Sequence, residues 1–136
     1  MQYRAPAWLP GGHAQTIWPA LYARRRWGPP LAKVRERWVT PDGDFIDVDR
    51  QQASRLDRPM VVLFHGLEGS SDSHYAQAFA LWARDAGVRL AVPHFRGCSG
   101  ELNLAPRAYH SGDHVEIGWM LAQARRARRG PVLAVG

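Results

Sequence analysis

The sequence predicts an α/β fold in which an antiparallel hairpin is followed by parallel strands with crossover helices. Two short apolar runs, Met60–Phe64 and Val88–Phe95, are separated by a stretch whose apolar residues recur at helical spacing. Runs of this length and composition are typical of strands buried on both faces of a parallel sheet. A second helical stretch and a third apolar run, Pro131–Gly136, repeat the pattern. The order strand, helix, strand, helix, strand indicates right-handed crossovers within one sheet.

The N-terminal part is expected to differ from the rest of the chain. Residues 1–30 are rich in Pro, Gly and Trp, so we predict an irregular N-terminal segment with one helical turn near Thr16 to Ala23. A chain of 136 residues holds one domain at most. Residues 31–136 are therefore predicted to form a single, incomplete α/β domain.

A hairpin is expected at the start of that domain. Lys33–Thr40 can form a strand, and Phe45–Asp49 alternates apolar and polar residues. Thr40-Pro41-Asp42-Gly43-Asp44 between them is a strong turn signal, because Pro presets one dihedral angle and Gly tolerates positive φ. The two strands are therefore expected to pair, and the polar stretch Gln51–Arg58 to form a loop.

The first crossover helix is expected to follow Ser70–Ser73, which offer several N-cap side chains. Gly87 is expected to end it in the manner of a C-cap. Spacings of four, three and four residues predict a buried stripe of Tyr75, Phe79, Trp82 and Ala86.

The second crossover helix is expected to begin near Asp113, which together with Glu116 three residues later resembles a capping box. Gly130-Pro131 is expected to stop it. Its predicted buried stripe consists of Ile117, Met120, Leu121, Ala124 and Ala127.

The charge pattern bears on possible partners. The formal charge of +6 comes from 18 Lys and Arg against 12 Asp and Glu, with arginines clustered at residues 24–26 and 125–129. Such clusters can attract nucleic acid or anionic lipid. The second cluster, however, falls in the last turn of a predicted helix, where cations favourably meet the helix dipole. Because no recognised binding motif accompanies either cluster, we predict no nucleic-acid partner.

Composition also suggests a compartment. No run of about 18 or more apolar residues occurs, so no transmembrane segment is predicted. The first residues lack the continuous apolar segment of a secretory signal. The single cysteine, Cys98, excludes an internal disulfide, which suits a reducing compartment. The expected location is therefore cytoplasmic, and the sequence does not indicate an oligomeric state.

A His-Gly pair follows the first apolar run. A sharp turn at His65-Gly66 would point a backbone N–H, that of Leu67, into a cleft at the strand's carboxyl end. Such a donor stabilises the oxyanion formed when a serine attacks an ester. The alternative is a simple turn with a satisfied histidine, and the pair by itself leaves both interpretations open.

The end of the chain fits the first interpretation. A strand ending in glycine, as at Gly136, can open the Gly-x-Ser-x-Gly elbow that holds a nucleophilic serine. The serine would then lie two positions past Gly136. We therefore expect the chain to carry the scaffold and one oxyanion-hole donor, but no part of a catalytic triad.

Several sequence blocks, in order along the chain, carry a family resemblance. They are Trp8-Leu9-Pro10-Gly11-Gly12-His13-Ala14-Gln15-Thr16-Ile17, His65-Gly66-Leu67-Glu68-Gly69-Ser70-Ser71, Tyr75, Phe95-Arg96-Gly97-Cys98-Ser99-Gly100-Glu101, Asn103 and Tyr109-His110-Ser111-Gly112-Asp113. In this order they resemble the YheT-like branch of the α/β-hydrolase superfamily, which contains esterases and lipases related to mammalian abhydrolase-domain lipid hydrolases. The resemblance extends from about Trp8 to Gly136.

The resemblance implies the N-terminal part of an α/β-hydrolase fold, with Leu67 as an oxyanion-hole donor and Gly136 as the start of the elbow. It implies a small-molecule or lipid ester as substrate and no metal or organic cofactor. The serine, acid and histidine of the family follow in that order beyond Gly136, so no histidine of this chain is expected in the triad. Two alternatives are a non-catalytic truncated α/β fragment and an acyltransferase on the same scaffold.

Other residues are possible members of a site. His110 and His114 are spaced to bind a metal, but capping explains the charges around them, so no metal site is predicted. Cys98 could be a nucleophile if a base were near, although a structural thiol is favoured. Arg96 could hold a substrate carboxylate or brace its loop through backbone carbonyls. The sequence does not decide whether His13, Gln15 and Thr16 pack near a site or only fasten the N-terminal segment.

Overall fold

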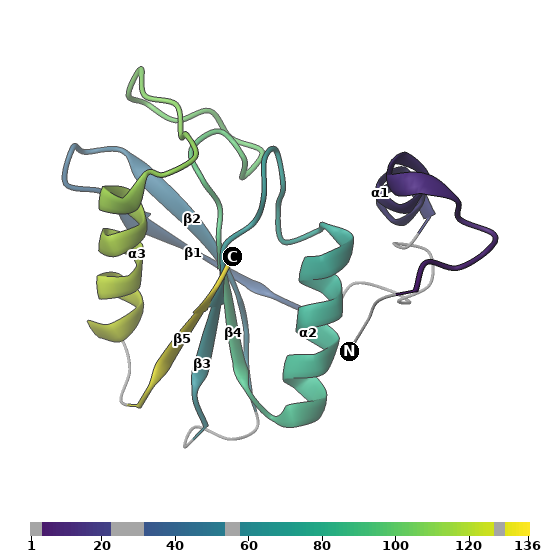
Figure 1. Ribbon diagram of the computed structural model, residues 1–136. Coiled ribbons are helices and arrows are strands. Elements are labelled where there is room, and N and C mark those ends of the chain that lie inside the picture. Colours follow the sequence, from purple (N-terminus) through teal and green to yellow (C-terminus); the bar gives the residue numbers. More distant parts are fainter. Residues whose placement is uncertain (1–3, 23–31, 54–57, 127–129) are drawn as a thin grey trace.

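The computed structural model describes residues 4–22, 32–53, 58–126 and 130–136 of the chain. Its elements are α1 (Gly11–Tyr22), β1 (Val34–Val39), β2 (Phe45–Gln51), β3 (Met60–Leu63), α2 (His74–Ala86), β4 (Arg89–Pro93), α3 (His114–Arg126) and β5 (Val132–Val135). Within the described residues, the strands form one sheet in the order β1-β2-β4-β3-β5 (Figure 1). The predicted α/β class is confirmed.

The sheet is antiparallel at one side and parallel at the other. β2 pairs antiparallel with both β1 and β4, whereas β3 pairs parallel with β4 and with β5. In this register Val61 of β3 lies beside Leu90 of β4 and Leu133 of β5. The carboxyl ends of β3, β4 and β5 therefore meet at one edge of the sheet, where ligands of open α/β sheets bind.

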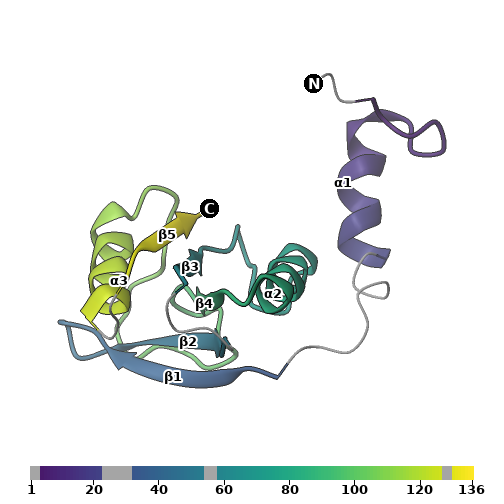
Figure 2. The same cartoon turned by 90° about the horizontal axis from the view of Figure 1, so that it is seen from below.

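The two crossover helices cover opposite faces of the sheet (Figures 1 and 2). On one face, Val62 of β3 packs in a buried cluster that includes Met120 and Ala124 of α3. On the other face, Val61 belongs to a cluster with Ala83 of α2. Successive residues of β3 thus point to two different cores, which is why the strand is apolar throughout.

The predicted stripe of α2 is wrong at Trp82 and Ala86, which are exposed, Trp82 to 50%. The buried positions are Ala76 and Ala83, two helical turns apart, and Phe79 is partly buried against the same cluster. Small alanine side chains let the helix backbone come close to the sheet, which moves the larger aromatic residues to its flanks. Hydrophobicity at helical spacing therefore predicted the helix but not which apolar residues face the sheet.

The α3 stripe is confirmed where it is described. Met120 and Ala124 are fully buried, and Ile117 and Leu121 pack against the same cluster. Ala127 lies outside the described residues.

The ends of the helices follow their predicted signals, with two differences. Ser73 stands at the N-cap of α2, but its side chain makes no capping hydrogen bond. Gly87 ends α2 with a left-handed φ of 64°. Asp113 precedes α3, and its Oδ1 accepts the N–H of Glu116 at 3.4 Å. The Glu116 side chain does not complete a capping box, because it forms an ion pair with Arg96 instead.

The N-terminal helix is longer than predicted. α1 runs over three turns and includes Pro19, whereas the sequence suggested one turn in an irregular segment. Trp18, the residue before Pro19, contacts the Trp8 ring edge-to-face and also contacts the Tyr22 ring at the end of the helix. α1 lies apart from the sheet in both views (Figures 1 and 2). The predicted boundary between the N-terminal segment and the α/β domain, at residues 30–31, lies outside the described residues.

None of the described helices is long and apolar enough to cross a bilayer.

Candidate functional site

The turn after β3 begins with a buried histidine. His65 Nε2 accepts the N–H of Phe95 at 3.0 Å, and its Nδ1 lies 2.9 Å from the Gly66 carbonyl oxygen. Because Nε2 accepts, the ring hydrogen is assigned to Nδ1, which donates. Burial lowers the pKa of His65 and so favours this neutral form. His65 therefore holds the ends of β3 and β4 together, as expected of a satisfied histidine.

The backbone N–H groups after His65 have different partners. The Gly66 N–H donates to the Tyr75 hydroxyl at 2.8 Å, and the Glu68 N–H donates to the Tyr109 hydroxyl at 2.7 Å. Among the hydrogen bonds found within the described residues, none uses the N–H of Leu67, and this residue is 86% exposed. The turn thus leaves one N–H for an external acceptor, between two that are occupied.

The shape of the turn is tightly constrained. Glu68 has a left-handed φ of 51°, which is unusual for a residue other than glycine. A Cβ on Gly69 would lie 2.7 Å from the Tyr75 hydroxyl oxygen and 2.9 Å from the Gly66 carbonyl oxygen. Only glycine fits at position 69 without displacing its neighbours.

Gly136 lies at the end of the strand next to this turn. The Phe64 N–H donates to the Val135 carbonyl at 2.8 Å, and a Cβ on Gly136 would be 3.8 Å from the Phe64 Cβ. Leu67 and Gly136, the two residues predicted to belong to a site, therefore follow neighbouring parallel strands at the same edge of the sheet.

Arg96 braces the loop that follows β4. Its buried guanidinium contacts three carboxylates, at 3.0 Å from Asp42, 2.8 Å from Asp44 and 2.7 Å from Glu116. The hydrogen bond from Arg96 lowers the pKa of Asp42 to about 2. The bracing interpretation is thus supported, but through carboxylates of the β1–β2 turn and α3 rather than through backbone carbonyls.

Asp44 fastens the same loop to the hairpin. Its carboxylate accepts the N–H groups of Leu104 at 3.0 Å and Ala105 at 3.1 Å, and the Asn103 amide at 2.9 Å. Burial raises the pKa of Asp44, but these donors lower it by more, so the group is held well below its usual range.

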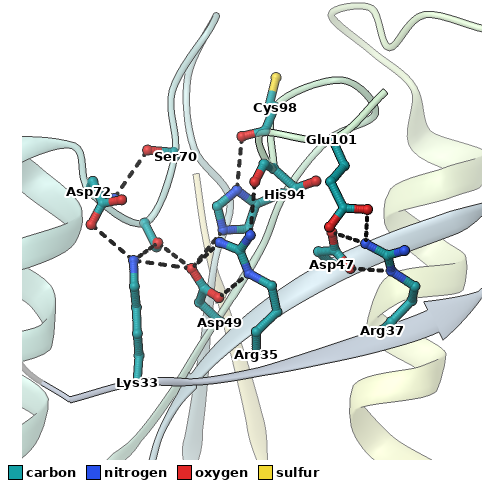
Figure 3. A network of polar contacts seen from close by, with 12 residues as sticks. Lys33, Arg35, Arg37, Asp47, Asp49, Ser70, Asp72, His94, Cys98 and Glu101 are labelled. Atoms are coloured by element: carbon teal, nitrogen blue, oxygen red, sulfur yellow. Dashed lines mark hydrogen bonds and ion pairs between the residues drawn. The ribbon is translucent and has the colours of Figure 1, made fainter. Parts of the chain in front are cut away.

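A third set of charges lies at the edge of the sheet formed by β1 and β2 (Figure 3). Asp49 accepts two hydrogen bonds from Arg35, at 2.8 and 2.9 Å, and one from His94 Nε2 at 3.0 Å. Asp47 accepts two from Arg37 at 2.7 and 2.9 Å. The alternation of β2 is real, but its polar face is buried as well. The sequence signal for a buried polar face was that Arg35 and Arg37 of β1 alternate in the same way as Asp47 and Asp49 of β2. The pairing of the strands places Arg35 opposite Asp49.

This network contains Ser71, Asp49 and His94, but their hydrogen bonds differ in order from those of a serine–histidine–acid triad. The Ser71 hydroxyl donates to Asp49 rather than to a histidine. Among the described residues, no serine hydroxyl is found hydrogen-bonded to a histidine ring.

The remaining candidates are not brought to the turn as reactive groups. Burial raises the pKa of the Cys98 thiol, which opposes thiolate formation. The Nδ1 atoms of His110 and His114 lie near backbone carbonyl oxygens, and the described residues contain no group of three metal-ligating side chains. Gln15 and Thr16 bond to backbone within the N-terminal segment, and α1, which also carries His13, lies far from the turn (Figure 2).

Solved structures identify the fold. A hyperthermophilic esterase from the archaeon Pyrobaculum calidifontis superposes with a TM-score of 0.56 at 17% identity, over 88% of this chain and 39% of that one. A thioesterase domain from the curacin biosynthetic pathway superposes with a TM-score of 0.53 at 19% identity, over 78% of this chain and 35% of that one. The architecture is the N-terminal part of the α/β-hydrolase fold.

Sequence relatives define the branch more closely. The Escherichia coli (strain K12) protein described as "Putative esterase YheT" is 40% identical over 127 residues, which is 91% of this chain and 36% of that protein. An abhydrolase domain-containing protein of Dictyostelium discoideum is 40% identical over 83 residues, 58% of this chain and 21% of that protein. The chain thus spans about a third or less of these relatives, and no protein-family model matches it. The resemblance to the YheT-like branch of the α/β-hydrolase superfamily is confirmed.

Proposed function

We propose that this chain is the N-terminal portion of a serine-dependent hydrolase of carboxylic esters, in which the Leu67 N–H is one donor of the oxyanion hole. The observation that carries the proposal is the Leu67 N–H without a partner among the described residues, between two N–H groups that are occupied. It lies at the carboxyl edge of the parallel strands, next to β5, the strand that Gly136 follows. The esterase name of the Escherichia coli relative is consistent with this chemistry.

In the proposed mechanism, Gly136 opens the nucleophile elbow and the serine lies two residues later. A histidine takes the serine proton during attack on the ester carbonyl, and an acid orients that histidine. The Leu67 N–H and the N–H after the serine stabilise the negative oxygen of the tetrahedral intermediate. The intermediate then collapses: the bond between the acyl carbon and the alcohol oxygen breaks, and the histidine gives its proton to the departing alcohol. Water, activated by the same histidine, hydrolyses the acyl-enzyme and frees the serine. This chemistry uses neither metal nor organic cofactor, and the substrate class is a small-molecule or lipid ester.

The gene downstream of residue 136 gives the first test. We expect an open frame that continues with any residue, serine, any residue and glycine, and further on with an acid and a histidine in that order. A stop codon directly after Gly136, or a continuation without serine at the second position, would refute the proposal. The 136-residue chain alone is expected to hydrolyse no p-nitrophenyl acetate or butyrate above a denatured control. Turnover that survives Cys98→Ala would contradict this expectation.

Variants at Leu67 in the full-length protein test the oxyanion role. Leu67→Ala keeps the N–H and should change kcat little, since the donor is main chain. Leu67→Pro removes the N–H and should lower kcat by about 10²–10³, or roughly 3–4 kcal/mol. Circular dichroism checks that the proline variant is folded, and an amide-to-ester replacement at that residue removes the N–H without a ring. A folded variant that lacks the N–H and keeps wild-type kcat would rule out the role.

The compartment that we propose is the cytoplasm, on the basis of the single, unpaired Cys98. Fractionation of cells that express the tagged full-length protein would test this.

A further inference from the structure

Two tyrosines from distant parts of the chain converge on the turn that carries Leu67. Tyr75 belongs to the first turn of α2, and Tyr109 belongs to the loop between β4 and α3. The Tyr75 hydroxyl accepts the N–H of Gly66, the residue before Leu67, and the Tyr109 hydroxyl accepts the N–H of Glu68, the residue after it. The two hydroxyls therefore occupy the donors on either side of the Leu67 N–H.

Both tyrosines are themselves held in place. The Tyr109 ring stacks on Phe95 with centroids 5.2 Å apart and an interplanar angle of 11°, and the Phe95 N–H is bonded to His65. The Tyr109 hydroxyl also lies 3.4 Å from Glu68 Oε1, to which it can donate. Tyr75 stands on a helix, and its hydroxyl oxygen would lie only 2.7 Å from a Cβ on Gly69. These contacts hold both hydroxyls at the turn, where each accepts a backbone N–H.

We infer that Tyr75 and Tyr109 are positioning residues that fix the turn and leave the Leu67 N–H as its one available donor. Without these acceptors, the N–H groups of Gly66 and Glu68 would lack a hydrogen-bond partner. The turn could then rotate so that one of them, instead of Leu67, donates to the oxyanion. A phenol suits this role because its oxygen accepts an N–H while its own hydrogen remains free to donate elsewhere. The catalytic part of this inference rests on the proposed function, whereas the hydrogen bonds can be tested without it.

Tyr75→Phe and Tyr109→Phe in the full-length protein remove each acceptor and keep the ring. In the wild type, amide hydrogen exchange followed by NMR should be faster at Leu67 than at Gly66 or Glu68. Tyr75→Phe should speed exchange at Gly66 roughly 3- to 10-fold, which corresponds to the net free energy of one hydrogen bond. It should leave the exchange rate at Glu68 unchanged. Tyr109→Phe should show the reverse pattern. Equal acceleration of all amides in the sheet would mean a general loss of stability and would overturn the inference.

Ester hydrolysis gives the second readout. Each tyrosine variant should lower kcat for p-nitrophenyl butyrate by about 10- to 100-fold, because a displaced donor misses the transition state. KM should stay unchanged, since the donor acts on the oxyanion and not on bound substrate. Tyr22→Phe is the matched control, because Tyr22 lies on α1 and no hydrogen bond of its hydroxyl is found within the described residues.

The outcomes separate the two claims. An active wild type with the predicted exchange pattern and lowered kcat in both variants supports the inference. An active wild type whose tyrosine variants keep full kcat would overturn the positioning role and leave the proposed function standing. A full-length wild type that hydrolyses no ester would overturn the proposed function and, with it, any catalytic role of the tyrosines.

Discussion

Replacing Asp44 by Asn removes one negative charge from the buried core and keeps the size of the side chain. The carboxylate accepts the N–H groups of Phe45, Leu104 and Ala105, the Asn103 amide and the Arg96 guanidinium. An asparagine has one carbonyl oxygen, which accepts about two hydrogen bonds, and its amide would point two donors at other donors. Removing one partner of a buried ion pair costs about 3–5 kcal/mol. Because Arg96 keeps two other carboxylates, we expect a loss of about 3 kcal/mol.

The assay is urea-induced unfolding of the full-length protein, followed by tryptophan fluorescence. A loss of about 3 kcal/mol is a large fraction of the 5–15 kcal/mol that stabilises a typical domain, so the midpoint should fall clearly. Asp85→Asn is the matched control, since Asp85 makes an exposed ion pair with Arg84 at 2.8 Å. Exposed pairs of this kind contribute at most about 1 kcal/mol. Equal, small shifts for both variants would refute the view that Asp44 holds the loop after β4.

Three further outcomes are expected. Burial lowers the pKa of His65, so the unfolded chain binds protons more readily than the folded one and stability should fall as pH drops below about 6.5. His65→Gln should remove that part of the pH dependence between pH 7 and 5. Curves of unfolding free energy against pH that run parallel for wild type and variant would contradict this. Gly69→Ala should lower the free energy of unfolding, measured with urea, by about 1–3 kcal/mol, because its Cβ would overlap the Tyr75 hydroxyl. Gly66→Ala should lower it less, because a Cβ there would lie 4.0 Å from that oxygen. The opposite order would be evidence against the described turn. Finally, β5 pairs with β3 alone among the described strands and leaves an apolar edge, so the 136-residue chain should self-associate; a monomer by light scattering with cooperative unfolding would contradict this.

The sheet and its helices could be predicted because their signals are local. β3 and β4 are short apolar runs, and each owes its character to two helices that cover opposite faces. The left-handed cap at Gly87 needs only the residue itself. By contrast, the packed face of α2 depends on how closely the helix approaches the sheet, and this favoured Ala76 and Ala83 over the larger Trp82.

The polar core could not be predicted because its partners are far apart in the sequence. Arg96 reaches Asp44 over 52 positions and Glu116 over 20. An arginine after a strand can brace a loop or bind a substrate, and only the third dimension shows which carboxylates surround it. The same holds for the candidate site. The sequence pointed to Leu67 as a donor, but the acceptors that occupy its neighbours, Tyr75 and Tyr109, lie on separate elements.

The loop between β4 and α3 connects the stability of the fold to the geometry of the turn. It carries Arg96 and Asn103, which bond to the hairpin, and further along it carries Tyr109, which bonds to the turn after β3. A change that loosens Arg96 should therefore also move Tyr109 and weaken its hold on the Glu68 N–H. On this reasoning Asp44→Asn should speed amide exchange at Glu68 more than at Gly66, whose acceptor stands on α2. This difference would separate a loop that only stabilises the fold from one that also positions the proposed oxyanion donor.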